Sequence, residues 1–133
     1  PTMELTGRGI GVVASDNREM ILGLQRDPLV IKRTRIDAMW GLVNLMDSAL
    51  KGSGELAAPA LILYGANDQL IAPGPTSEMV SRLSADIPVA LYKNGWHMLL
   101  RDLQGKAVWR DIAAWIHNPA GPLPSGHAAA ATE

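Results

Sequence analysis

Asp68 and His97 are the two side chains of this sequence whose types and positions fit acid–base chemistry. Asp68 follows the apolar run Ala60–Tyr64, and His97 follows the run Pro88–Tyr92. If both runs are parallel strands of one open sheet, their carboxyl ends lie at the edge where active sites of such sheets form. A carboxylate bonded to one ring nitrogen fixes the tautomer of a histidine and leaves the other nitrogen facing a nucleophile. The spacing therefore predicts an acid–histidine pair at this edge.

Each of the two residues also has an ordinary structural explanation. Aspartate is common in turns because its side chain hydrogen-bonds to the backbone of the turn, and a single histidine is usually structural. Their occurrence after two successive strands favours the catalytic interpretation for the pair, although neither residue alone would carry it.

The elements that must position this pair are two strands, residues 60–64 and 88–92, with one helix between them and one after them. An unbroken apolar strand is typical of a parallel sheet covered on both faces. Pro75 suits the first position of the intervening helix, and the final helix is expected at about 103–117. A strand–helix–strand unit of this length joins its strands in parallel with a right-handed crossover. The inner faces of the helices are expected to be Met79, Val80 and Leu83, and then Val108, Ile112, Trp115 and Ile116.

The first 54 residues indicate helices that precede the sheet. Residues 1–17 are expected to be irregular, and a phosphate-binding loop is disfavoured because no helix directly follows their glycines. Asp16 or Asn17 is expected to cap a short helix that ends near Gln25. Thr34 with Asp37 forms a capping pair for the longest helix. That helix is expected to end at residues 52–54, with an apolar face of Ile36, Met39, Trp40, Val43, Met46 and Leu50.

Composition narrows the classes of function. The chain has 133 residues, 12 basic and 13 acidic side chains, and no cysteine. Neither a basic face for nucleic acid, nor a polybasic membrane anchor, nor disulfides or cysteine-bound zinc are expected. No apolar run approaches the roughly 20 residues that cross a bilayer, and the first residues lack the pattern of a signal peptide. No cofactor or metal is predicted, and the cytoplasm or the membrane periphery is the expected compartment.

Two segments resemble the α/β-hydrolase superfamily. Residues 59–68, Pro-Ala-Leu-Ile-Leu-Tyr-Gly-Ala-Asn-Asp, resemble its strand-plus-acid segment, and residues 93–102, Lys-Asn-Gly-Trp-His-Met-Leu-Leu-Arg-Asp, resemble its histidine loop. Within the superfamily, the sequence is most similar to the monoacylglycerol lipase, lysophospholipase and serine aminopeptidase group. Asp27–Val30 and the later Trp40-Gly41 are similar to the cap region of that group, so the resemblance covers about residues 16–117.

This resemblance implies a serine hydrolase of carboxylic esters, with Asp68 as the triad acid, His97 as the general base and an acyl-enzyme intermediate. In this fold the chain order is serine, acid, histidine, so the serine is expected before residue 1. The chain alone is expected to be inactive, because a nucleophile and oxyanion donors supply most of the transition-state stabilisation. No G-x-S-x-G occurs, and the serines that lack this context are Ser15, Ser48, Ser53, Ser77, Ser81, Ser84 and Ser125.

The expected organisation is a cap-like helical segment (1–54), the C-terminal part of a hydrolase core (55–118) and a mobile tail (119–133). The predicted partners are an acyl ester or lipid substrate, the missing N-terminal half of the core, and a second copy at the exposed edge of strand 60–64. Neither nucleic acid nor a transmembrane segment is expected. The side chains expected to contact the substrate are Met39, Trp40, Val43, Met46, Ile71 and Met98.

Two other functions stay open at this point. A non-catalytic interaction module that kept half of a hydrolase fold would lack an upstream nucleophile elbow. An upstream aspartate nucleophile would instead make an enzyme like the dehalogenases or epoxide hydrolases. The residue at the elbow distinguishes these functions from a serine hydrolase.

Overall fold

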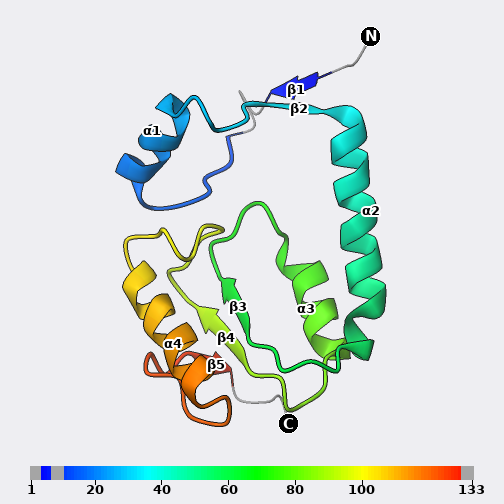
Figure 1. Cartoon of the computed structure of the whole chain (residues 1–133), viewed down its shortest axis with the longest axis vertical. Helices are drawn as coiled ribbons and strands as arrows, with labels where there is room; N and C mark the ends of the chain where they lie inside the picture. The colour runs from blue at the N-terminus through cyan, green and yellow to red at the C-terminus, as the bar shows by residue number, and fades with distance from the viewer. Residues whose placement is uncertain (1–3, 7–10, 130–133) are drawn as a thin grey trace.

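The computed structural model describes residues 4–6 and 11–129 and is built around a small sheet. Strands β3 (Ile62–Gly65) and β4 (Val89–Tyr92) pair in parallel, with Ile62 opposite Val89, which confirms the predicted parallel unit. A third strand, β5 (Ala128–Ala129), pairs antiparallel with β4, so the order is β3-β4-β5 and β3 lies at an edge. Figure 1 shows this sheet with α3 (Pro73–Arg82) beside β3 and α4 (Gly105–His117) on the side of β4.

The hydrophobic core lies between β4, α4 and the segment that follows α4. Ala90, Tyr92, Val108 and Leu123 are buried, and each comes from one of these three parts. Of the predicted stripe on α4, Ile116 is 65% exposed and so lies outside the core. The partly buried residues packed against the core are Leu61, Leu63, Leu99, Ile112 and Trp115.

The segment after α4 belongs to the core, so the predicted mobile tail is wrong for residues 119–129; the remaining four lie outside the described residues. Leu123 is 6% exposed, and the buried carboxylate of Asp111 accepts hydrogen bonds from the backbone N–H of Ser125 (2.9 Å) and from its hydroxyl. The hydroxyl of Tyr92 donates to the same carboxylate at 2.6 Å. Burial raises the pKa of Tyr92, and the adjacent Asp111 raises it further. One apolar anchor and one buried polar cluster are enough to hold this Pro- and Gly-rich segment.

The N-terminal part contains two helices and a short ribbon. Helix α1 (Arg18–Arg26) is capped by Asn17, whose side chain accepts from Met20 N at 3.1 Å, as predicted. Strands β1 (Glu4–Thr6) and β2 (Arg33–Arg35) pair antiparallel, so the prediction of an irregular segment is wrong for residues 4–6. Helix α2 (Ile36–Gly52) follows β2 directly, and the 3-10 turn η1 (Ser53–Glu55) follows α2.

Two predicted helix starts are corrected. Thr34 lies in β2 opposite Leu5, so it does not cap α2. Arg35 occupies the N-cap without a side-chain capping bond, and its guanidinium donates to Asp37 at 2.9 Å. Helix α3 begins at Pro73, two residues before Pro75, because Ala72 is the extended residue before the first turn.

Helix α2 stands apart from the sheet for most of its length. Its N-terminal end meets β2, and its C-terminal end meets η1 and α3 (Figure 1). It contains no buried residue, and Trp40 on its predicted apolar face is 67% exposed. No helix of the described part of the chain is long and apolar enough to span a bilayer.

Candidate active site

The structure brings Asp68 and His97 together at the carboxyl ends of β3 and β4. His97 Nδ1 lies 2.9 Å from Asp68 Oδ2. The Asp68 side chain is 7% exposed and that of His97 is 37% exposed. Within the described residues, His97 Nε2 has no hydrogen-bond partner, so this nitrogen is the one that solvent or another group can reach. The geometry expected from the two apolar runs is therefore present.

The loop after β3 fixes the direction of the Asp68 carboxylate. Its Oδ1 atom accepts from the backbone N–H groups of Leu70 (2.8 Å) and Ile71 (2.9 Å), which leaves Oδ2 for His97. Burial acts to raise the pKa of Asp68, but the hydrogen bonds from Ile71, His97 and Leu70 outweigh it, so this pKa lies below its ordinary value. The carboxylate is thus an anion at neutral pH and orients a histidine ring with Nδ1 protonated.

The two loops are also joined through their backbones. Asn67 N donates to Gly95 O at 2.9 Å, and Ala66 N donates to Tyr92 O at 3.0 Å. Gly65 is required at this crossing, because a Cβ there would lie 2.5 Å from the carbonyl carbon of Gly95 and 2.6 Å from Trp96 O. Gly95 is confined less strictly, since its Cβ would lie 2.4 Å from a methyl of Leu99, which can move, but also 2.9 Å from Tyr92 Cβ and 3.1 Å from Gly65 Cα. The absence of two side chains therefore sets how closely the acid and histidine loops approach.

The sequence did not predict the residues that fix the histidine loop through hydrogen bonds to its backbone and to Asp102. The buried carboxylate of Asp102 accepts from Trp96 N at 2.8 Å and from the Ser15 hydroxyl at 2.5 Å. Ser15 thus bonds to Asp102 and not to His97. The two partners are 87 residues apart in the chain, so no local spacing pointed to them.

The six predicted substrate contacts fall into two groups. Ile71 and Met98 adjoin the pair, since Ile71 N binds Asp68 and Met98 follows His97. The other four lie on α2 and are 38–67% exposed, so the structure gathers no acyl-binding surface from all six. They are Met39, Trp40, Val43 and Met46.

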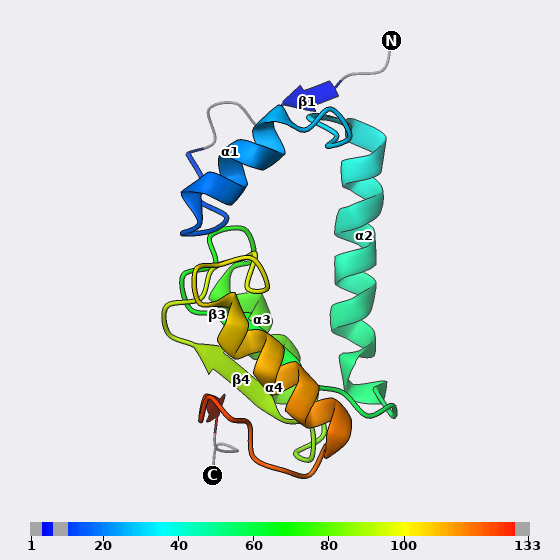
Figure 2. The same cartoon turned by 60° about the vertical axis from the view of Figure 1, so that its left-hand side comes forward.

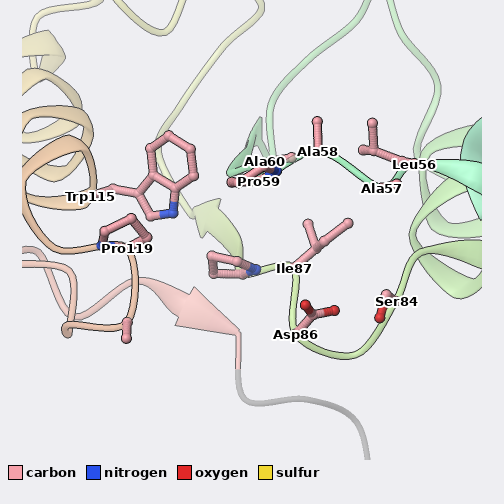
Figure 3. Close-up of a pocket in the computed structure, with 12 residues that line it drawn as sticks. Leu56, Ala57, Ala58, Pro59, Ala60, Ser84, Asp86, Ile87, Trp115 and Pro119 are labelled. Carbon is pink, nitrogen blue, oxygen red and sulfur yellow. The ribbon is translucent and has the colours of Figure 1, made fainter.

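Two surface pockets lie elsewhere. One, of about 430 Å³, is lined by the segments that lead into β3 and β4 and by Trp115 and Pro119, so it sits at the opposite ends of these strands from the candidate site (Figure 3). The other, of about 370 Å³, lies between the start of α1 and residues 100–109. Neither pocket is lined by a predicted substrate contact.

The arrangement can move a proton but carries no visible nucleophile of its own. A histidine held by an anionic carboxylate can accept a proton at Nε2 and then return it. Within the described residues no serine hydroxyl bonds to His97, and no group of three or more Asp, Glu and His side chains could hold a metal ion.

Comparisons with known proteins show which family and fold this chain resembles. The family model described as serine aminopeptidase, S33, matches residues 1–104. A monoacylglycerol lipase of Mycolicibacterium smegmatis is 27% identical over an alignment of 105 residues, and the match covers 70% of this chain and 38% of that protein. The crystal structure of the Paleococcus ferrophilus monoacylglycerol lipase superposes with a TM-score of 0.75 at 24% identity, over 87% of this chain and 46% of that one.

The chain thus spans less than half the length of both relatives. The family match extends from the N-terminal residues to the end of the histidine loop, and the structural match covers most of the described elements. The chain therefore has an α/β-hydrolase fold of the monoacylglycerol lipase-like group and belongs to the serine aminopeptidase S33 family.

Proposed function

We propose that this chain supplies the acid, Asp68, and the general base, His97, of a serine hydrolase that cleaves carboxylic esters. The single observation that carries the proposal is the 2.9 Å contact between His97 Nδ1 and Asp68 Oδ2 at the carboxyl ends of two parallel strands. The serine that completes the triad is proposed to lie on a segment outside these 133 residues, since the fold orders its triad serine, acid, histidine.

The proposed steps follow from this geometry. His97 Nε2 accepts the proton of the serine hydroxyl as the serine oxygen attacks the ester carbonyl, and Asp68 stabilises the imidazolium that forms. The imidazolium then donates this proton to the departing alcohol, which leaves an acyl-enzyme. Water, activated by the same Nε2, releases the carboxylic acid and regenerates the serine. Asp68 stays ionised throughout, which its lowered pKa supports.

The proposed substrate is an ester with a medium or long acyl chain. Both relatives carry the name monoacylglycerol lipase, and the exposed apolar side chains of α2 offer an adaptable surface. The proposed contacts with the acyl chain are Met39, Trp40, Val43, Met46, Ile71 and Met98.

The proposed protein partner is the complementary part of the hydrolase sheet. Strand β3 has one neighbour, β4, among the described strands, and an unpaired edge of this kind is a template for another strand. The exposed α2 would be covered by the same partner. A second copy of this chain, bound at the same edge, is the proposed substitute when that partner is absent.

The test begins with the reading frame upstream of Pro1, which should encode a strand, a G-x-S-x-G elbow and a helix. The protein from the complete frame should hydrolyse a monoacylglycerol. His97→Ala and Asp68→Asn should each lower kcat by about 10³- to 10⁴-fold, whereas the control His117→Ala, at the end of α4, should not.

The purified 133-residue chain should show no turnover of the same ester. Turnover by this chain that His97→Ala abolishes would contradict the proposed location of the nucleophile. An aspartate at the elbow would assign the enzyme to the dehalogenase- or epoxide hydrolase-like type, and a frame without any elbow would assign a non-catalytic module.

A further inference from the structure

Residues 13–17, called the strap from here on, run across both loops of the candidate site just before α1. In both views α1 lies beyond the carboxyl ends of β3 and β4 (Figure 1, Figure 2). Every residue of the strap makes a hydrogen bond to the acid loop or to residues 98–103. The bonds are Val13 N to Gln69 Oε1 (2.9 Å), Met98 N to Ala14 O (3.0 Å), Ser15 Oγ to Asp102 Oδ1 (2.5 Å), Leu103 N to Asp16 Oδ1 (2.9 Å) and Asn17 Nδ2 to Arg101 O (2.9 Å).

His97 lies between two amides that are both held by this arrangement. Trp96 N donates to Asp102 Oδ2, and Met98 N donates to Ala14 O. Met98 N belongs to the peptide group that follows His97, and Trp96 N belongs to the peptide group between Gly95 and Trp96. The segment is therefore held on both sides of His97, which presents the ring to Asp68 from a defined position. Asp102 is the link between the two sides, because its carboxylate binds Trp96 with one oxygen and Ser15 with the other.

The burial of the Ser15–Asp102 pair indicates that its hydrogen bonds are part of the folded core and not a chance contact at the surface. Asp102 is 5% exposed and Ser15 is 4% exposed, and a buried carboxylate is tolerated only when its oxygens are hydrogen-bonded. The chain holds a second pair of the same kind, Ser125 and Asp111, which secures the segment after α4 instead of the histidine loop. That second pair provides a matched control for effects on stability alone.

We propose that Asp102 is a positioning residue for His97, and that the strap, through Ser15 and Ala14, holds Asp102 and the histidine loop in the geometry that the Asp68–His97 bond requires. The part of this inference that concerns catalysis rests on the proposed function. The part that concerns the geometry of His97 does not.

The geometric part is tested on the full 133-residue chain by NMR, with the downfield signal of the His97 Nδ1 proton as the readout. Asp102→Leu should move this signal upfield or remove it by exchange, and Ser15→Ala should do so partially. Asp102→Asn keeps one acceptor for Trp96 N and should retain the signal better than Asp102→Leu. The control Ser125→Ala deletes an equivalent hydroxyl at Asp111, so it should lower Tm without changing the signal.

The catalytic part is tested on the protein from the complete reading frame. Ser15→Ala and Asp102→Asn should lower kcat by about 10-fold and Asp102→Leu by about 100-fold, because a small displacement of a catalytic group has effects of this size. KM should stay within about two-fold, since the ground-state contacts with substrate are intact. Ser125→Ala should leave kcat unchanged.

The outcomes separate this inference from the proposed function. If His97→Ala and Asp68→Asn abolish activity while folded Ser15→Ala and Asp102→Asn proteins keep both the proton signal and kcat, the positioning role is overturned. If His97→Ala leaves activity intact, the proposed function fails, and the NMR signal still decides whether Asp102 positions the ring. Should Asp102→Leu not fold, Ser15→Ala and Asp102→Asn decide the question.

Discussion

The carboxylate of Asp68 accepts three hydrogen bonds while it is 7% exposed, and this has a consequence for stability at low pH. Its pKa in the folded state lies below the ordinary value of 3.8. A group with a lowered folded pKa stabilises the protein above its unfolded pKa, and this stabilisation is lost as the pH falls through the folded value. We therefore expect the wild-type free energy of unfolding to fall below about pH 4 in part through Asp68.

The measurement is a series of urea unfolding curves between about pH 5 and pH 2, followed by tryptophan fluorescence. Asp68→Asn should be less stable than wild type at neutral pH, with a shallower loss of stability on acidification. The matched control is Asp47→Asn, an exposed aspartate on α2, which should keep the wild-type slope. A slope for Asp68→Asn equal to that of wild type would contradict the assigned role of this carboxylate.

For single residues, their position in the sequence explains which site residues could be predicted and which could not. Asp68 and His97 were predictable because each follows an apolar run closely, and because parallel strands present their carboxyl ends at one edge. Ser15 and Asp102 were not, since their contact joins residues that are 87 positions apart. A polar pair of this kind has no period and no motif, so only the folded chain reveals it.

Among the elements, the crossing of the acid and histidine loops depends on Gly65. A methyl group at this position would meet the backbone of Gly95 and Trp96 at 2.5–2.6 Å, and backbone atoms cannot move aside as a flexible side chain can. We expect Gly65→Ala to destabilise the fold by about 1–3 kcal/mol, the usual cost of overpacking. Urea unfolding measures this loss, and the His97 Nδ1 proton signal reports whether the loops have separated.

Gly41 in α2 is the matched control for this substitution. A Cβ there meets nothing within 4 Å, and alanine has a higher helix propensity than glycine. Gly41→Ala should therefore stabilise the protein by about 0.5–1 kcal/mol. Equal effects of the two substitutions would refute the claim that close loop approach confines Gly65.

The sequence predicted which helices and strands exist better than it predicted where they end and which segments they contact. Apolar runs identified β3 and β4, helical spacing identified α2 and α4, and a capping residue identified α1. The start of α2 was misplaced because Thr34 pairs with Leu5 in an antiparallel ribbon. Capping rules consider only neighbouring residues in the sequence, so they do not detect such a pairing. The segment after α4 was misjudged from composition, because one buried residue, Leu123, and two bonds from Ser125 to Asp111 outweigh its proline and glycine content.

For the molecule as a whole, the hydrophobic core covers one face of the sheet, whereas α2 stays exposed to solvent among the described residues. Helix α2 has no buried residue, and Trp40 and Leu45 are 67% and 65% exposed. We take this exposed apolar surface of α2 as part of the proposed contact with the complementary part of the hydrolase. The position of β3 at the edge of the sheet points the same way, because its outward backbone groups have no strand to pair with among the described residues.

The amide of Leu63 tests whether this edge is the site of association. Ile62 N and Ala66 N donate to Pro88 O and Tyr92 O on the β4 side, and the alternation of a strand therefore turns the Leu63 N–H outward and the Tyr64 N–H toward β4. In hydrogen exchange on dilute chain, Leu63 should exchange quickly and Tyr64 slowly. At high concentration, or with the complementary part of the hydrolase added, Leu63 should become protected while Tyr64 changes little. If sedimentation shows association while Leu63 still exchanges quickly, the contact lies on the apolar surface of α2 and the edge-pairing proposal is wrong.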